Sequence, residues 1–243
     1  MRRKRLSGSD RRASIVRAAQ AVFAAKGFEG ATMHDIAREG RISHGLIFQH
    51  FATKEALYRA VLRGLIKTQD EAHATFGALE PSAQGLVRML TAYFSQCLRP
   101  TGPYSAESAR IEMASLAGDG SYAKLVARRA ARFSLKALGR ALTAARENGD
   151  LAGPVQDPAN VFLFLQTLGA NLIVARSRPD QLLPYSRDDA QVLQDAVWFC
   201  ARGIGLQDRV LCTLNLEEHF TSIEFESLCN GAPAAGAPGE TVA

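Results

Sequence analysis

Two short helical segments, residues 32–39 and 43–50, are separated by a tight turn, and this feature most constrains how the chain can fold. Thr32 is followed three residues later by Asp35, an arrangement of the capping-box type that begins the first segment. Ser43 can cap the second segment. Two short helices joined in this way form a helix-turn-helix, which can place its second helix in the major groove of DNA.

Apolar residues at helical spacing predict one further helix on each side of this pair. The preceding helix has Asp10 as its candidate N-cap and Gly27 as its end, and its apolar stripe consists of Ile15, Ala18, Ala19, Val22 and Phe23. Thr53 can cap the following helix, whose apolar stripe consists of Leu57, Val61 and Leu65. Four helices therefore fit before residue 76.

Glycine and proline residues divide the rest of the chain into five long helical segments. These breakers are Gly77, Pro81, Pro100, Gly102, Pro103, Gly118, Gly120, Gly149, Gly153, Pro154, Pro179 and Pro184. No segment shows a convincing strand pattern, so the predicted fold class is all-α. Past Leu206 the helical pattern weakens. Residues 215–228 could form one more helix, and residues 230–243 have the Ala/Gly/Pro composition of a disordered tail.

Charge is distributed unevenly along the chain. Residues 1–67 hold 14 Lys/Arg and 5 Asp/Glu, a balance of +9, whereas the whole chain carries +5. A basic end joined to a neutral or acidic body is typical of nucleic-acid binding, although a merely solvated basic N-terminus would give the same balance. Residues 2–9 lack an apolar stripe, so we expect residues 1–11 to form a mobile basic arm that lies along phosphates or enters the minor groove.

The N-terminal sequence resembles a known family. Residues 32–57 have the sequence TMHDIAREGRISHGLIFQHFATKEAL, which is similar to the pattern of TetR/AcrR transcriptional regulators. The resemblance covers about residues 12–62. The matching positions are Thr32, Ile36, Ala37, Ser43, Gly45, His50, Phe51, Lys54 and Leu57.

The sequence departs from the family pattern at two points. Phe48 stands where tyrosine is usual, so a hydroxyl that commonly reaches a phosphate is missing. The turn Gly40-Arg41-Ile42 replaces the commoner Ala-Gly-Val. Either Arg41 adopts an unfavourable left-handed conformation, or the turn shifts by one residue.

The resemblance implies a helical dimer with a three-helix DNA-binding domain at residues 12–62 and a larger effector-binding and dimerisation domain at residues 63–229. We predict a cytoplasmic transcriptional regulator, by default a repressor that leaves its operator when a small effector binds. An architectural DNA-binding dimer without an effector is the alternative, and a helical enzyme is a third hypothesis.

The candidate DNA contacts all lie in or beside the helix-turn-helix. By resemblance, His50 and Lys54 should contact phosphates, while Ile36, Ala37, Phe51 and Leu57 should pack the domain core. Glutamine can bond adenine and leucine can meet a thymine methyl group, so exposed side chains of the second short helix should set operator preference. The full candidate set is Thr32, Ser43, His44, Gly45, Leu46, Phe48, Gln49, His50 and Lys54.

Two apolar segments predict a homodimer. Residues 161–175 are apolar nearly all round, so a face that does not pack inside its own subunit must be covered elsewhere. Residues 192–206 are similarly rich, with Trp198, Phe199 and Ile204. By resemblance, the two segments of each subunit would form a four-helix dimer interface, and an ordinary monomer core is the alternative.

An effector cavity, by resemblance, would lie among the helices between residues 81 and 180. Candidate wall residues are Met89, Tyr93, Phe94, Ile111, Phe133 and Phe162. Aromatic residues at helical spacing more often belong to a filled core than to a pocket. The expected effector is small and mostly apolar, with one polar group.

Other classes of protein find little support in the sequence. Residues 1–5, MRRKR, precede a polar rather than an apolar stretch, which argues against a secretion signal, and the segment 161–175 is short for a membrane span. The cysteines and histidines show no metal-ligand spacing, and no catalytic motif is found. We therefore expect no cofactor, no metal, no membrane and no enzymatic activity.

Overall fold

The computed structural model describes residues 7–77, 80–99, 105–178, 180, 184–186 and 188–212. Within these residues every regular element is a helix, as predicted. Residues 1–6 of the predicted basic arm, the further helix at 215–228 and the disordered tail at 230–243 lie outside the described residues.

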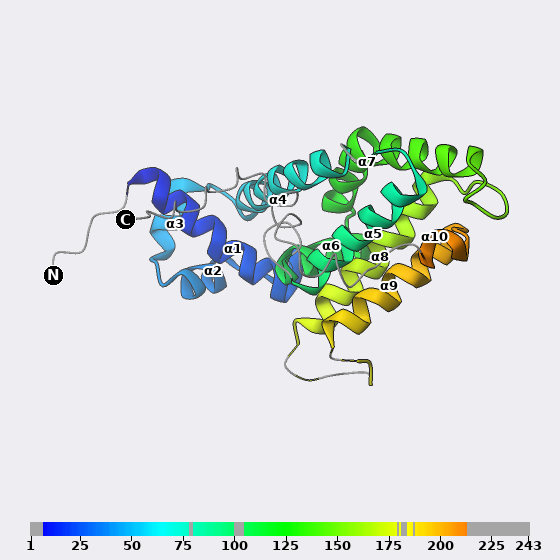
Figure 1. Cartoon of the computed structure of the whole chain (residues 1–243). Helices are drawn as coiled ribbons and strands as arrows, with labels where there is room; N and C mark the ends of the chain where they lie inside the picture. The colour runs from blue at the N-terminus through cyan, green and yellow to red at the C-terminus, as the bar shows by residue number, and fades with distance from the viewer. Residues whose placement is uncertain are drawn as a thin grey trace, which may run out of the picture.

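The four N-terminal helices follow the predicted order. They are α1 (Gly8–Gly30), α2 (Met33–Gly40), α3 (His44–His50) and α4 (Lys54–Gly77). Figure 1 shows α1, α2 and α3 gathered at one end of the molecule, with α4 running from them towards the body. Gly27 interrupts α1 with a φ of 69°, at the residue where the sequence predicted its end.

The start of α1 corrects one prediction. Ser7, not Asp10, is the N-cap, and its hydroxyl accepts a hydrogen bond from the backbone N–H of Asp10. Asp10 is the third helical residue, and its carboxylate accepts from the N–H of Ser7. The two side chains thus form a capping box, in which each satisfies a backbone donor of the other.

The N-terminal core extends beyond the predicted domain. Ile15, Ile36, Ile47 and Leu57 are fully buried, and Ile36, Ala37, Phe51 and Leu57 pack inside as expected. The same buried cluster includes Ile111 of α6 and Tyr122 and Val126 of α7. The predicted boundary after residue 62 falls inside α4, so the N-terminal helices and the body share one continuous helix, and one buried cluster joins them.

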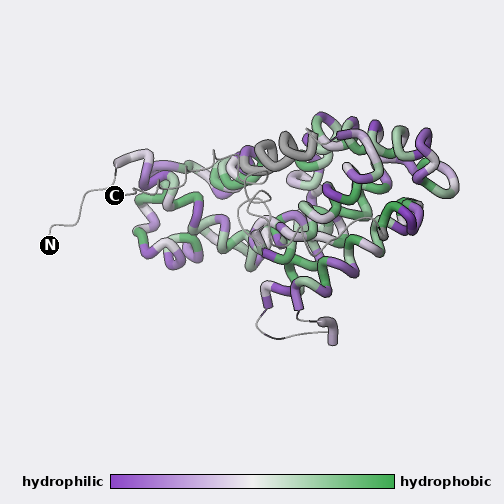
Figure 2. Tube along the Cα trace, in the orientation of Figure 1, coloured by the Kyte–Doolittle hydropathy of each residue, from purple (hydrophilic) through white to green (hydrophobic). Residues whose placement is uncertain are grey.

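The body contains the five long helices predicted between the breakers. They are α5 (Ala83–Leu98), α6 (Ala106–Ala117), α7 (Ser121–Glu147), α8 (Pro158–Arg176) and α9 (Asp189–Ile204), and the short α10 (Asp208–Cys212) follows. Their core combines side chains from α5, α7, α8 and α9. Figure 2 shows hydrophobic and hydrophilic residues interleaved along the helices, as this packing requires.

Helix α8 leaves part of its apolar surface uncovered within the chain. Leu163 and Phe164 of α8 are 54% and 64% exposed, and Phe199 of the neighbouring α9 is 74% exposed. Only part of this helix packs within the chain, so these apolar side chains stay open to solvent. By length and composition α8 would also suffice to cross a membrane, which corrects the expectation that the segment is too short; one such helix is weak evidence of a span.

Candidate functional site

The helix-turn-helix is held together by local caps. The Thr32 hydroxyl accepts from the backbone N–H of Asp35 at 3.1 Å, and the Asp35 carboxylate accepts from the N–H of Thr32 at 3.2 Å. The predicted capping box of α2 is therefore present. The Ser43 hydroxyl accepts from the N–H of Leu46 at 3.2 Å and caps α3, as predicted.

Asp35 also joins α2 to α1. Its carboxylate lies 2.7 Å from the Lys26 ammonium and 2.9 Å from the Arg38 guanidinium. The hydrogen bonds from Lys26 and Thr32 lower the pKa of Asp35 from 3.8 to about 2. Because folding lowers this pKa, the stabilisation is complete above the ordinary carboxyl pKa and is lost as the pH falls towards 2.

The turn between α2 and α3 uses a left-handed arginine. Arg41 has φ 49° and ψ 45°, and the N–H of Ile42 donates to the carbonyl of Ala37 at 3.0 Å. Of the two conformations left open by the sequence, the structure therefore shows the unfavourable Arg41 backbone rather than a shifted turn. This bond pattern closes the end of α2 and fixes the direction in which α3 begins.

We expect Arg41→Gly to raise the free energy of unfolding by about 1 kcal/mol, because glycine removes the cost of a Cβ atom in the left-handed region. The greater freedom of glycine in the unfolded chain offsets part of this gain. Urea denaturation measures the difference. Arg41→Ala is the matched control, because it removes the same charge but keeps the Cβ atom. Equal stabilities of the glycine and alanine variants would show that the turn is not strained.

One face of α3 is open to solvent. Ile47 is fully buried and anchors the helix, whereas His44, Phe48 and Gln49 are exposed, with the rings of His44 and Phe48 packed edge to face at 4.8 Å. A Cβ atom at Gly45 would meet no neighbouring heavy atom of the described fold within 4 Å. Packing inside the protein therefore does not explain the glycine, and the exposed face remains available to a partner.

The remaining predicted DNA contacts have mixed surroundings. Ser43 and Thr32 are exposed, but both hydroxyls already take part in helix caps. Leu46 and His50 are half-buried at the edge of the open face of α3. Their contacts with DNA stay predictions.

Lys54 has a structural role that the sequence did not indicate. Its ammonium donates to the carbonyls of Phe28 and Ala31, at 2.9 and 3.1 Å, and lies 4.5 Å from the centre of the Phe28 ring. It thereby ties the connection between α1 and α2 to the start of α4. An ammonium has three donors, so one N–H is left for the predicted phosphate contact.

The match to known sequences begins in α1 and ends in α4. A sequence model of the family described as bacterial regulatory proteins, tetR family, covers residues 15–61, which include the whole helix-turn-helix. Residues 15–61 of the chain belong to the TetR family. This family consists of regulatory proteins rather than enzymes, which agrees with the prediction that the chain is not an enzyme.

Relatives extend the likeness in two ways. Over 62 residues this chain is 42% identical to the HTH-type transcriptional repressor Rv3405c of Mycobacterium tuberculosis, a match that covers 25% of this chain and 33% of that protein. The chain thus spans about a third of that relative's length in the match. A tetR-family regulatory protein from Rhodococcus RHA1 superimposes with a TM-score of 0.61 at 25% identity, over 83% of this chain and 100% of that one.

A third likeness concerns the fold alone. AibR, whose structure was solved in complex with isovaleryl coenzyme A and operator DNA, has a TM-score of 0.59 to this chain. The two are 17% identical, and the match covers 78% of this chain and 97% of that one.

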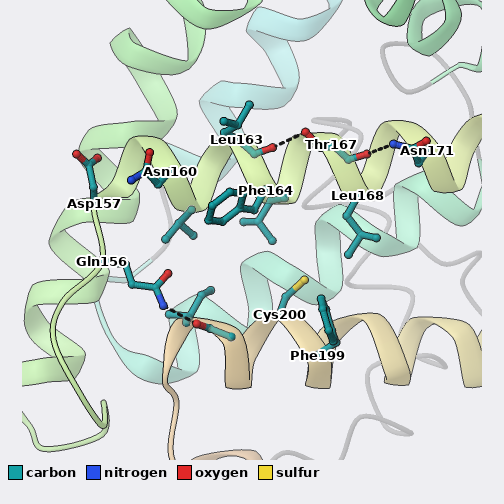
Figure 3. Close-up of a pocket in the computed structure, with 14 residues that line it drawn as sticks. Gln156, Asp157, Asn160, Leu163, Phe164, Thr167, Leu168, Asn171, Phe199 and Cys200 are labelled. Carbon is teal, nitrogen blue, oxygen red and sulfur yellow. Dashed lines mark hydrogen bonds between the residues drawn. The ribbon is translucent and has the colours of Figure 1, made fainter.

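Two hollows adjoin α8 of this chain. The α8–α9 groove, of about 1000 Å³, is lined mainly by Phe164, Leu168, Phe199 and other side chains of these two helices (Figure 3). The α6–α8 cavity, of about 540 Å³, lies among α6, α7 and α8. Leu163, Thr167 and Asn171 line both hollows, so one ridge of α8 separates them.

Of the six predicted effector residues, only Phe162 lines the α6–α8 cavity. Phe94 and Ile111 are fully buried core residues, which is the alternative that the sequence left open. Met89 and Tyr93 are half-buried against the body core, and Phe133 packs beside the Arg132 guanidinium at 5.2 Å. The sequence analysis did not select four polar residues of the wall, namely Glu112, Gln166, Thr167 and Asn171. The signal for Glu112 is an acidic residue in the run IEMASLA, residues 111–117, whose other members are apolar or small.

No group of three or more potential metal ligands is found in the part of the chain that the structure describes.

Proposed function

We propose that this chain is a transcriptional regulator that binds double-stranded operator DNA through α3. The observation that carries the proposal is the open face of α3 on a helix-turn-helix that belongs to the TetR family. Exposed Gln49 and His44 are suited to base edges in the major groove, and Phe48 is suited to a thymine methyl group. Thr32, Ser43, His50 and Lys54 lie around this face, where phosphate contacts would position the helix.

A homodimer would cover the open surface of α8 and α9. The α8–α9 groove is apolar, and Figure 3 shows Phe164 and Leu168 on α8 above Phe199 and Cys200 on α9. Two such surfaces facing each other would form a four-helix interface around a twofold axis. Each subunit would then present one α3 to one half-site, about 34–36 Å from the other.

We further propose that a small effector in the α6–α8 cavity releases the protein from DNA, so that it acts as a cytoplasmic repressor. The cavity favours this mechanism over an architectural DNA-binding protein without an effector. Helix α6 forms one wall of the cavity and also contacts α1, because the Gln20 side-chain amide donates to the Glu107 carboxylate at 2.7 Å. A shift of α6 would therefore move the DNA-binding end.

The ridge on α8 offers a second connection. Leu163, Thr167 and Asn171 face both the cavity and the α8–α9 groove, so an effector that displaces them would also alter the proposed dimer interface. A ligand can shift such an equilibrium only by its difference in affinity for the two states. Effector binding would thus favour the dimer geometry in which the two α3 helices no longer match the half-sites.

Selection of binding sites from random DNA tests the function. The intact protein is expected to enrich a two-fold symmetric site. In Gln49→Ala, base preference should change by about 1–3 kcal/mol at one position in each half-site, because glutamine bonds adenine through two atoms. The exposed Gln84 of α5 gives the matched control, Gln84→Ala, which should select the same site as the intact protein. Enrichment of no sequence by the intact protein would contradict the proposed function.

A further inference from the structure

The wall of the α6–α8 cavity is almost wholly apolar. Small and medium side chains from three helices line it, including Met113, Ala130 and Ala170. Among the residues that the structure describes, Glu112 is the one ionisable side chain in this wall, and no described lysine or arginine takes part in it. The cavity therefore presents negative charge, or a neutral carboxyl group, to whatever it holds.

Glu112 is buried with few partners. It lies in the middle of α6 and is 7% exposed. The Gln166 side-chain amide donates to both carboxylate oxygens, at 3.2 and 3.3 Å, and no ion pair of the described residues includes Glu112. A carboxylate has about four acceptor positions, so one amide nitrogen leaves much of its capacity unused. Burial raises the pKa of Glu112, and the Gln166 hydrogen bond opposes this shift.

The other polar groups of the wall are turned to their own helix. The Thr167 hydroxyl donates to the carbonyl of Leu163, and the Asn171 amide donates to the carbonyl of Thr167, both at 2.8 Å (Figure 3). The cavity thus offers Glu112, held by Gln166, as its main hydrogen-bond acceptor. A nearby hydroxyl, that of Tyr122, is also buried without a hydrogen-bond partner among the described residues.

A purely structural role explains this arrangement poorly. A buried polar pair between α6 and α8 could be replaced by apolar residues of similar volume at little or no cost in stability. A carboxylate without a countercharge is costly to bury, whereas a bound cation would remove that cost. Charge-assisted hydrogen bonds are also about twice as strong as neutral ones.

We infer that the α6–α8 cavity takes apolar molecules that carry a protonated amine, and that Glu112 accepts the hydrogen bond of the ammonium group. The inference rests on the proposed function, because it names the chemical class of the effector. An anionic molecule of the same shape is disfavoured, since its charge would face that of Glu112, and no described residue of the wall supplies a cation to offset it.

The test uses three probes with one skeleton: 4-phenylbutylamine, 4-phenylbutanol and 4-phenylbutyrate. Isothermal titration calorimetry with the full chain should show the amine binding at least about tenfold more tightly than the alcohol, with the carboxylate weakest. In Glu112→Gln, which keeps the shape of the side chain, the affinity of the amine should fall to that of the alcohol. Glu147→Gln, an exposed position at the end of α7, is the matched control and should keep the tenfold preference.

An amine that binds no better than the alcohol, or a preference that survives in Glu112→Gln, would overturn the inference, as would the absence of any amine binding at millimolar concentration. If Glu112→Gln fails to fold, Glu112→Met serves as an uncharged side chain of similar length. A separate measurement of operator binding distinguishes a failure of the Glu112 amine site from a failure of the proposed effector mechanism. Selective amine binding that leaves operator affinity unchanged would support the Glu112 site and contradict its role as the effector site.

Discussion

Replacing Gly45 with alanine is expected to lower operator affinity at least about 100-fold, a loss of about 2.7 kcal/mol, while the protein stays folded. The added Cβ atom meets no neighbouring heavy atom of the described fold within 4 Å, so the free protein has room for it. Alanine is also the better helix former, by up to about 1 kcal/mol. On the proposed DNA-facing side of α3, however, the methyl group would hold the backbone away from the groove wall.

Gly64 provides a matched control for this experiment. It lies in α4, away from the open face of α3, and a Cβ atom there also meets open space. Gly64→Ala should therefore stabilise the fold without weakening operator binding. Fluorescence anisotropy with operator DNA and thermal denaturation measure the two effects. If Gly45→Ala binds the operator as tightly as the unchanged protein, α3 does not approach DNA at this residue.

The helix-turn-helix could be predicted because its signals are local. Thr32 and Ser43 cap helices whose first turns lie next to them in sequence, and both bonds appear in the structure. The N-terminus of α1 was placed less well, since Ser7 and Asp10 can each cap a helix and the sequence alone does not show that they act together. The Arg41 conformation was one of two outcomes that the sequence left open, and the structure shows the left-handed one.

The role of Lys54 could not be predicted from residue types. Its partners are backbone carbonyls of Phe28 and Ala31, and every residue has a carbonyl, so the sequence carries no mark of the contact. The resemblance suggested a phosphate contact for the same side chain. Both roles need a cation beside the start of α4. Only the contact with the two carbonyls depends on where the end of α1 lies relative to α4.

The residues that line the α6–α8 cavity could not be predicted, for a different reason. Large aromatic side chains were expected to line it. Phe94 is instead fully buried in the body core, where a large side chain fills space that would otherwise be a void. The cavity instead forms where small residues, such as Ala127 and Ala130 of α7, leave space between three helices. Such space depends on the distances between helices, which no local pattern encodes.

The same limit does not apply to the outer face of α8. Residues 161–175 are apolar nearly all round, so any face of this segment that does not pack inside the chain leaves apolar surface open. Phe164 and Phe199 are exposed as that argument requires. We expect a second copy of the chain to cover them in solution.

Phe164→Asp is expected to convert a dimer into monomers. If a second copy covers the α8–α9 groove, each dimer buries two copies of Phe164, each contributing about 2 kcal/mol. Losing both should raise the dimer dissociation constant about a thousandfold, since about 4 kcal/mol is at stake. Operator affinity should fall as well, because two α3 helices would no longer be held one helical turn apart.

Sedimentation equilibrium from nanomolar to micromolar concentration measures this change, and Leu116→Asp is the matched control. Leu116 is 64% exposed, the same fraction as Phe164, but it lies on α6 outside the α8–α9 groove. An equal number of exposed apolar side chains is therefore removed in both variants, and only the position differs. A Leu116→Asp protein that dissociates as readily as Phe164→Asp would assign the dimer contact to another surface.

An unchanged chain that is monomeric at micromolar concentration would refute the homodimer, because the exposed apolar surface of α8 and α9 would then have no partner subunit to cover it.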